Sequence, residues 1–230
     1  MNEKSAVSTT TPYLTLGLMC GDTHAKNGLS RALKSVIERT SGEPLVDEIV
    51  LGWNGKDNDA VEAALSLVGY MCLNDARLEF EPYATQRPVL PPIRVVQYSW
   101  PGRFDLARNE YWRQCRGEWV MWLDCDDVVA DAGTPKGLKA IERVEKDYGI
   151  PPPQEGSNAP STSLKTWLAQ LPQQVNVVYS PYDYTIDEND YVHIRQKMKR
   201  VVRRSTGHVW HSPEQSGIHE MLTAFGGVPE

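Results

Sequence analysis

Residues 95–129 read VVQYSWPGRFDLARNEYWRQCRGEWVMWLDCDDVV, and the apolar run at 119–123 ends in the acidic cluster Asp124-Cys125-Asp126-Asp127. The run has the length and composition of a buried β-strand. Side chains at i and i+2 of a strand point to the same side of the backbone, so we expect Asp124 and Asp126 to face one site. Paired carboxylates suit a hard divalent cation, which in turn favours an anionic partner such as a diphosphate.

The same acidic cluster has a simpler interpretation. Aspartate is a common turn residue, and an arbitrary D-x-D-D sequence is about as often a solvated turn that caps the next helix. The residues upstream favour a site instead. An amphipathic helix opens at Phe104-Asp105-Leu106-Ala107-Arg108-Asn109, and Arg116-Gly117 ends it just before the apolar strand. Helix, glycine, strand and acidic end therefore form one compact unit.

This unit resembles the family 2 glycosyltransferases of GT-A fold, whose pattern here is F-x-x-A-R-N, a helix, and G-(D/E)-W-(V/I)-x-(W/F)-L-D-x-D-(D/E). The resemblance implies that Asp124 and Asp126 bind Mn²⁺ or Mg²⁺ and that Asp124 faces the nucleotide-sugar donor. It also implies that Arg108 and Asn109 lie along the nucleotide pocket. The implied activity is transfer of a sugar from a nucleoside-diphosphate sugar, with a UDP-sugar as the first choice, to a hydroxyl of an unknown acceptor.

The composition is that of one globular domain. The chain has 230 residues, 40% hydrophobic and 23% charged, and no apolar run near the roughly 20 residues of a membrane-spanning helix. Residues 1–12 lack the basic and apolar regions of a secretory signal. We therefore expect a flexible tail over 1–12 and a single soluble, cytoplasmic domain over 13–230. The formal net charge of −6 argues against general nucleic-acid binding but leaves a nucleic-acid acceptor open.

The cysteines indicate a reducing compartment. None of them shows C-x-x-C spacing, and at least two fall inside predicted apolar elements. We expect reduced thiols, not a zinc site or a disulfide framework, at Cys20, Cys72, Cys115 and Cys125.

Strand and helix signals alternate along the first half of the chain. Residues 14–19, 49–51 and 93–97 read as short strands, and apolar residues at helical spacing occur in 29–37 and 61–68. The Pro-rich residues 82–92 read as a loop. This β-α-β alternation predicts an α/β fold of GT-A type (Rossmann-like), with a doubly wound, mostly parallel sheet and helices on both faces.

In such sheets ligands bind outside the carboxyl ends of the strands, so the loop after each strand is expected to face one site. The first loop supplies Asp22, where the resembled family has an acidic residue near the nucleoside. The second loop departs from the family pattern D-x-G-S-x-D, because Trp53 replaces the first carboxylate, and Asp57 follows. Trp53 either stacks on the donor base or is a partly buried loop aromatic. Asp57 and Asp59 have the alternative roles of turn and helix-cap residues.

The region after the acidic cluster begins with a predicted helix from Thr134-Pro135 to about residue 148. Residues 149–173 are rich in Pro and Ser and read as a loop insertion on the acceptor side, with a short helix at 165–171.

The sheet is expected to resume at 175–180, and residues 191–204 suggest a small antiparallel hairpin centred on 188–190. The second arm of the hairpin is basic. It is either an edge strand protected by charge or, through Arg200, a contact to the donor diphosphate.

A second motif, Gly217-Ile218-His219-Glu220, lies near the C-terminus. It resembles the G-x-(V/I)-H-E-x-L of the same family, which implies that His219 is the third metal ligand, a role for which imidazole is suited. Inverting transfer needs a general base that deprotonates the acceptor hydroxyl, and Glu220 is the first candidate. Asp183, after the strand at 175–180, is the second. Both residues also have structural alternatives, since Glu220 can hold His219 and Asp183 can cap a turn.

Two other functions use a site of this kind. Metal-dependent nucleotidyl transfer also employs strand-end carboxylates, but it does not account for A-R-N and H-E together. A non-catalytic nucleotide- or sugar-binding module on the same fold would be expected to lack a metal carboxylate, whereas Asp124, Asp126, Asp127 and His219 are all present. The sugar, the base, the acceptor and the oligomeric state stay open at this point.

Overall fold

The computed structural model describes residues 12–83, 89–149, 163–186, 192–212 and 221–223. Its main sheet has six strands in the order β5-β2-β1-β6-β8-β7. Neighbouring strands among the first four are parallel, and the last two strands join through antiparallel pairings. The mostly parallel α/β sheet expected from the sequence is confirmed. In sheet order the strands are β5 (Ile93–Gln97), β2 (Glu48–Trp53), β1 (Leu14–Cys20), β6 (Trp119–Asp124), β8 (Val192–Arg203) and β7 (Val177–Ile186).

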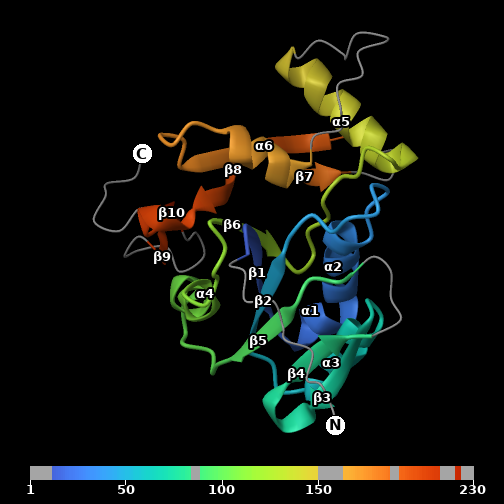
Figure 1. Ribbon diagram of the computed structural model, residues 1–230, viewed down its shortest axis with the longest axis vertical. Helices are drawn as coiled ribbons and strands as arrows, with labels where there is room; N and C mark the ends of the chain where they lie inside the picture. The colour runs from blue at the N-terminus through green and yellow to red at the C-terminus, as the bar shows by residue number, and fades with distance from the viewer. Residues whose placement is uncertain (1–11, 84–88, 150–162, 187–191, 213–220, 224–230) are drawn as a thin grey trace, which may run out of the picture.

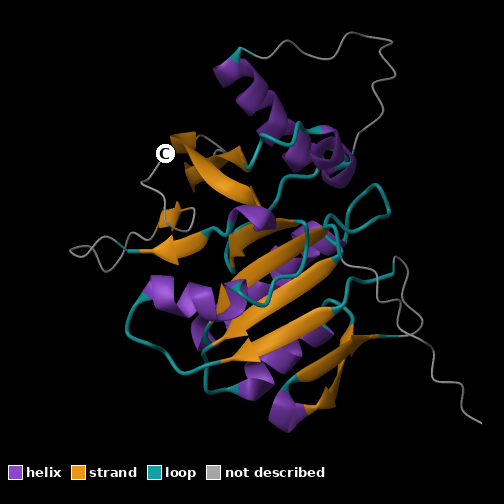
Figure 2. Cartoon of the chain, turned by 60° about the vertical axis from the view of Figure 1, so that its left-hand side comes forward, coloured by secondary structure: helices purple, strands orange, loops and turns teal. Residues whose placement is uncertain are grey.

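Helices cover both faces of this sheet (Figures 1 and 2). The larger apolar core lies on one face, beneath α1 (Asp22–Asn27), α2 (Leu29–Ile37), α3 (Asn58–Ser66) and α6 (Leu164–Gln170). The smaller core lies on the other face, beneath α4 (Phe104–Trp112) and a two-stranded sheet of β9 (Val209–His211) and β10 (Met221–Thr223).

Strand β6 is apolar at every position before its acidic end because both of its faces are buried. Trp119, Met121 and Leu123 pack into the larger core, and Val120 and Trp122 into the smaller one. The parallel, doubly covered sheet thus explains an uninterrupted apolar run.

Two glycines allow α4 to approach the sheet closely. A Cβ atom at Gly17 of β1 would lie 2.9 Å from the ring of Tyr111, and one at Gly52 of β2 would lie 2.4 Å from it. Tyr111 is fully buried as a result. This contact sets the height of α4, and therefore of the side chains that α4 carries, above β1 and β2.

The first half of the chain also contains elements that the sequence did not reveal. Helix α1 begins directly after β1, and a hairpin of β3 (Tyr70–Asn74) and β4 (Glu79–Pro82) follows α3. The connection between β3 and β4 is the 3-10 helix η1 (Asp75–Arg77), which ends at Leu78 with a φ of 47°. That left-handed position holds leucine where glycine is the usual signal, so the turn was not recognised.

The second half of the chain follows the predicted order. Helix α5 (Pro135–Tyr148) starts at Thr134, whose hydroxyl accepts the N–H of Gly137, and ends at Gly149 with a φ of 64°. Strand β7 is longer than the predicted 175–180 and pairs with β8 as the expected hairpin, whose turn lies outside the described residues. Helix η2 (Arg204–Thr206) then leads to β9.

Parts of three other predictions also lie outside the described residues, namely most of the tail 1–12, residues 150–162 of the insertion, and the motif at 217–220. Helix α6 falls inside the insertion, one residue before the predicted start, and is anchored by the buried Leu168. All four cysteines are free thiols. A membrane-crossing helix is not found in the described part of the chain, since none there combines the needed length and apolarity.

Candidate active site

The strand order predicts a ligand-binding crevice at the carboxyl ends of β1 and β6. The chain moves outward from β1 to β2 and β5 and then returns to place β6 on the other side of β1. Doubly wound sheets bind ligands where the strand order reverses in this way, outside the carboxyl ends of the two strands. Met19 pairs with Asp124 in the last register of the two strands, so Asp124 stands at this crevice.

Asp124 is held by a buried cation. The Arg108 guanidinium lies 2.7 Å from Asp124 Oδ1; the arginine side chain is 6% exposed and the aspartate side chain 40% exposed. The guanidinium carbon lies 4.9 Å from the ring centre of Trp122 and 4.6 Å from that of Trp210. Cation–π contacts and the ion pair together fix the guanidinium. Asp124 is therefore oriented from below while it still reaches solvent.

Asp127 supports Asp124 from the other side. Its Oδ2 accepts the backbone N–H of Asp124 at 2.8 Å and lies 2.9 Å from Arg200 Nη1. The Tyr182 ring packs beside the same ion pair, with its centre 4.7 Å from the guanidinium carbon of Arg200. Burial raises the pKa of the Asp127 carboxyl, and the charge of Arg200 opposes that rise. Asp127 is thus an internal support of the acidic cluster and not a solvent-facing ligand.

Arg200 is placed differently from its predicted role. Its side chain is 4% exposed, pairs with Asp127, and lies with its guanidinium carbon 3.9 Å from the ring centre of Trp122 and 4.7 Å from that of Tyr182. Alternation along β8 turns Arg200 inward against the acidic cluster. Its charge serves Asp127, so the structure gives it a supporting role in place of a direct contact to a diphosphate.

Asp126 is the second carboxylate that reaches solvent. Its side chain is exposed, and its carbonyl oxygen accepts a hydrogen bond from Arg31 Nη2 at 3.3 Å. Asp124 and Asp126 thus offer oxygen atoms of the type that a hard cation prefers. Within the described ranges no group of three or more His, Cys, Asp and Glu side chains is arranged to hold a metal. His219 lies outside those ranges.

Asp22 and Asp57 organise the loop after β2. Asp22 Oδ1 accepts the backbone N–H groups of Lys56 at 2.8 Å and Asp57 at 2.9 Å. Asp57 caps α3 by accepting the N–H of Ala60, and it lies 2.8 Å from Lys26 Nζ. The hydrogen bond from Lys26 holds the pKa of the Asp57 carboxyl below its usual value. The helix cap is therefore Asp57, not Asp59, and both predicted donor-binding carboxylates have structural bonds.

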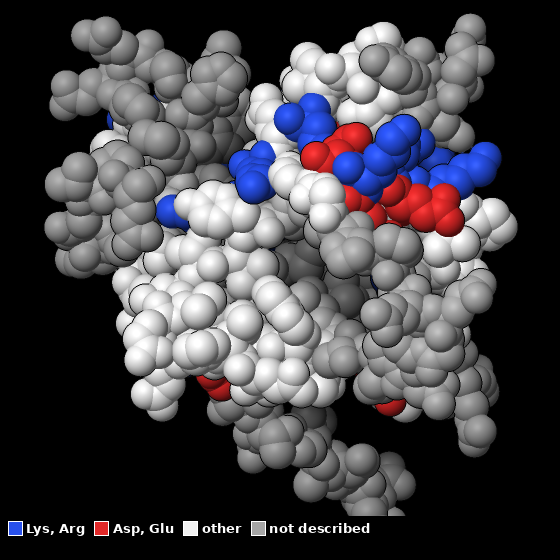
Figure 3. All heavy atoms as spheres, turned by 90° about the horizontal axis from the view of Figure 1, so that it is seen from above, with Lys and Arg blue, Asp and Glu red and all other residues white. Residues whose placement is uncertain are grey.

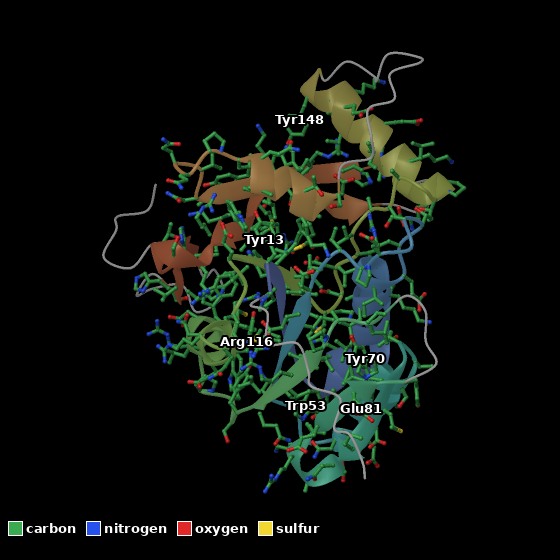
Figure 4. The ribbon with its side chains drawn as sticks, in the orientation of Figure 1. Tyr13, Trp53, Tyr70, Glu81, Arg116 and Tyr148 are labelled. Atoms are coloured by element: carbon green, nitrogen blue, oxygen red, sulfur yellow. The ribbon has the colours of Figure 1, made fainter. Side chains whose placement is uncertain are left out.

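Trp53 lies in the core. Its side chain is 1% exposed, and its Nε1 donates to Asn58 Oδ1 at 3.2 Å, between the sheet and the start of α3 (Figure 4). Its alternation on β2 points it into the larger core, and a Cβ atom at Gly55 would lie 2.2 Å from its ring. The structure gives Trp53 a packing role, because a closed-off ring cannot stack on a base.

Asn109 fixes strand β9 and does not face the crevice. Its Nδ2 donates to the carbonyl of Trp210 at 2.8 Å, and its Oδ1 accepts the N–H of Trp210 at 2.9 Å. Trp112 Nε1 donates to the carbonyl of His208 at 2.7 Å, and Asp105 Oδ2 accepts the N–H of Ser212 at 3.2 Å. Side chains on one face of α4 thus hold residues 208–212 in place through hydrogen bonds to their backbone. The predicted residues His219 and Glu220 lie outside the described residues.

Asp183 belongs to an ion-pair cluster between β7 and α5. Its carboxylate accepts from Arg195 Nε at 2.5 Å and Arg195 Nη2 at 3.0 Å, and Arg143 lies 3.9 Å away. Arg195 also pairs with Asp147 of α5. Figure 3 shows basic and acidic side chains interspersed on the upper side of the molecule, where α5 and the hairpin lie. A side chain that is 15% exposed and doubly paired is poorly placed to accept a proton.

The sequence analysis missed two aromatic pairs, one after β5 and one on β7, toward the end of the sheet where Asp124 lies. Trp100 and Phe104, after β5, have ring centres 4.9 Å apart and exposed fractions of 45% and 37%. Tyr182 and Tyr184, on β7, have ring centres 6.0 Å apart. The aromatic content of the loop after 93–97 was the available signal for the first pair. The second pair required the position of β7.

A cavity of about 240 Å³ lies elsewhere on the α4 face. Trp112, Cys115, Val120, Val202 and His208 are among its lining residues. Val120 is near the amino end of β6, so this cavity lies away from Asp124 and is not part of the crevice.

The sheet order and the carboxylates at its crevice define an α/β protein of GT-A-like fold. A sequence model described as glycosyl transferase family 2 matches residues 23–204. Because this match covers most of the chain, the protein belongs to glycosyl transferase family 2. No curated protein sequence matches the chain.

Several solved structures are similar to this chain at low identity. TarS 1-349 from S. aureus is 14% identical with a TM-score of 0.36, over 60% of this chain and 33% of TarS 1-349. The same piece in complex with UDP-GlcNAc is 14% identical with a TM-score of 0.36, over 60% of this chain and 32% of that chain. The 4-diphosphocytidyl-2C-methyl-D-erythritol synthase from Anaerococcus prevotii DSM 20548 is 13% identical with a TM-score of 0.37, over 84% of this chain and 72% of that chain. The chain spans about a third of the TarS piece.

Proposed function

We propose that this protein is a metal-dependent glycosyltransferase that moves a sugar from a nucleoside-diphosphate sugar to an acceptor hydroxyl with inversion. Membership of glycosyl transferase family 2 supports the class of reaction. The observation that carries the proposal is the half-exposed carboxylate of Asp124, held 2.7 Å from the buried Arg108 at the crevice between β1 and β6. A carboxylate oriented by a buried cation, yet open to solvent, is suited to bind a ligand and not only to cap a turn.

The proposed cofactor is Mn²⁺ or Mg²⁺, held by Asp124, Asp126 and His219. Two solvent-facing carboxylates fit such a cation, and Asp127 is excluded from the set because its side chain is buried and its Oδ2 serves Asp124 and Arg200. When bound, the cation would neutralise the negative charge that develops on the departing nucleoside diphosphate. Arg108 adds positive charge beneath the same carboxylate.

The proposed donor is a UDP-sugar, and UDP-GlcNAc is the first to test because TarS has been seen in complex with it. We assign the base-stacking role to Trp100 in place of the buried Trp53. Trp100 is 45% exposed on the loop after β5, and β5 is the neighbour of β2, whose loop carries Asp57. An exposed indole offers the flat face that a base needs.

The proposed general base is Glu220. Transfer with inversion requires a group that accepts the proton of the acceptor hydroxyl on the side opposite the leaving group. Asp183, the alternative, is engaged by Arg195 and Arg143 and its side chain is 15% exposed, so an acceptor hydroxyl has little access to its oxygen atoms.

The experiment that tests this function is a calorimetric titration with UDP-GlcNAc and a panel of nucleoside diphosphates, in Mn²⁺ and in EDTA. We expect one nucleotide to bind in Mn²⁺, to bind at least about tenfold more weakly in EDTA, and to lose binding in Asp126→Ala. Asp75→Ala, which removes an exposed carboxylate from η1, is the matched control and should bind normally. If no nucleotide binds the wild-type protein, the proposal fails.

A further inference from the structure

The hairpin of β7 and β8 extends past the end of the central strands. β6 pairs with β8 only from Trp119–Arg203 to Met121–Val201, whereas β7 and β8 stay paired as far as Ile186 and Val192. Both β6 and β7 are antiparallel to β8, so β7 runs in the direction of β6. The free length of the hairpin therefore projects on the side where Asp124 ends β6.

One face of β7 lies directly against the support of the acidic cluster. Burial raises the pKa of the Tyr182 hydroxyl, and the Asp127 charge acts in the same direction. The Tyr182 ring also lies 4.7 Å from the guanidinium carbon of Arg200. Tyr182 thus docks the hairpin onto the residues that hold Asp124.

Tyr184 continues this face outward. Its ring centre lies 6.0 Å from that of Tyr182 at an interplanar angle of 65°, and the residue is 65% exposed. The register of β7 shifts between Asp183 and Thr185, which marks a β-bulge at this position. Bulges occur next to active sites, where they re-aim a side chain. The bulge accounts for the exposed ring of Tyr184 beside the packed ring of Tyr182.

We propose that Tyr184 is the stacking surface for a sugar ring of a carbohydrate acceptor. The inference rests on the proposed glycosyl transfer and names the class of its acceptor. A pyranose presents C–H groups on one face, and these pack on the electron-rich face of an aromatic ring.

The position of Tyr184 favours the acceptor over the donor base. The exposed aromatic pair of Trp100 and Phe104 follows β5, at one edge of the sheet, and Tyr184 lies on β7, at the other edge. Asp124 on β6 lies between them. A donor that stacks its base near β5 and places its phosphates at Asp124 leaves the β7 side for the acceptor.

The test is ligand-observed NMR with four neutral oligosaccharides, namely maltotetraose, cellotetraose, chitotetraose and mannotetraose. We expect one of them to bind the wild-type protein and Tyr184→Ala to weaken that binding by about tenfold. Tyr184→Phe keeps the ring and should stay within about twofold of wild type. Tyr179 is 52% exposed on the same strand, but it pairs with Lys199 near the start of β7 and is not part of the Tyr182–Tyr184 ring pair. Tyr179→Ala is therefore the matched control and should bind normally.

The outcomes separate this inference from the proposed function. Binding by Tyr184→Ala at wild-type affinity, or binding of none of the four oligosaccharides by the wild-type protein, overturns the inference. Calorimetry with UDP-GlcNAc should give the same dissociation constant for Tyr184→Ala as for wild type, and an equal loss of nucleotide binding would also overturn it. If the wild-type protein binds no nucleotide, the proposed function is wrong, regardless of whether it binds an oligosaccharide.

Discussion

Arg108 lies 2.7 Å from Asp124 and is enclosed by the indole rings of Trp122 and Trp210. The pair joins α4 to the end of β6, and the aromatic rings exclude water from one partner only. An ion pair of this kind has a preset geometry, because the buried cation has few other positions and the carboxylate follows it.

The first prediction concerns the shape of this cation. Arg108→Lys retains the charge but loses the planar fork and the stacking on two indoles, so Asp124 should lose its fixed orientation. We expect the affinity for the nucleotide found by calorimetry to fall by about tenfold or more. Arg113→Lys, an exposed change at the C-terminal end of the same helix, serves as the control. Equal dissociation constants for both variants would contradict an orienting role.

The second prediction concerns the clamp between α4 and β9. Asn109→Ala removes two hydrogen bonds to the backbone of Trp210 and leaves buried polar groups without partners. The free energy of unfolding should fall by about 2–3 kcal/mol, as measured by urea denaturation. Asn27→Ala, at an exposed position of α1, should change it by less than about 0.5 kcal/mol. If Asn109→Ala is as stable as wild type but binds nucleotide poorly, the result would support the expectation that Asn109 lies along the nucleotide pocket.

The third prediction separates two tryptophans. Trp53→Ala empties a core position and should cost about 3–5 kcal/mol of stability. Trp100→Ala alters a half-exposed ring, so it should leave the unfolding midpoint nearly unchanged but weaken nucleotide binding several-fold, by about 1 kcal/mol or more of stacking energy. Denaturation and calorimetry on both variants check this. Unchanged nucleotide binding by Trp100→Ala would remove the base-stacking assignment.

The fourth prediction is a pH dependence. Burial alone would raise the pKa of Asp105, but hydrogen bonds from Arg103 and from the N–H of Ser212 hold it below its ordinary value. Such a carboxylate contributes stability that is present above the pKa of the unfolded chain, about 3.9, and is lost as the pH falls through the lower folded pKa.

Asp105→Asn should accordingly be less stable than wild type at pH 7, by about 1 kcal/mol or roughly 2–4 °C in Tm. The two melting temperatures should converge as the pH falls below about 4. Calorimetric scans across that range provide the measurement, and a difference that grows toward acid would show that the contacts of Asp105 act in some other way.

The fifth prediction addresses the general base. Glu220→Gln should lower kcat by about 10²-fold or more while donor binding persists, because only the proton acceptor is lost. Asp183→Asn should instead lower the melting temperature, since it breaks the pairing with Arg195 and Arg143, and should keep kcat near wild type. Steady-state kinetics of sugar transfer distinguish the two, and the reverse pattern would make Asp183 the base.

Local patterns predicted the scaffold well. The strands at 14–19, 49–51, 93–97 and 119–123 and the helix that opens at Phe104 are all present, because each combines apolar periodicity with a clear start or stop signal. The hairpin of β3 and β4 escaped notice because its turn residue is Leu78 at positive φ. Irregular turns carry no compositional signal that a sequence pattern can use.

Roles within the site were less predictable than its place. Asp124, Asp126 and Asp127 are equivalent in a written motif, yet only the third is buried against a cation. Arg200 was expected at the donor and instead completes that buried pair. The difference depends on the register between β8 and β6, which sets the face of the sheet on which Arg200 lies, and alternation alone leaves two choices open.

The sequence by itself determined that carboxylates stand at the end of a buried parallel strand, because apolar runs and strand periodicity are local properties. Only the tertiary structure decided that Asp124 pairs with Arg108, that Trp53 is closed into the core, and that Asn109 holds Trp210. These outcomes depend on contacts between residues up to 101 positions apart in the chain. The burial of a side chain and its choice of ion-pair partner depend on such distant contacts. They are therefore determined only when α4 packs on the sheet.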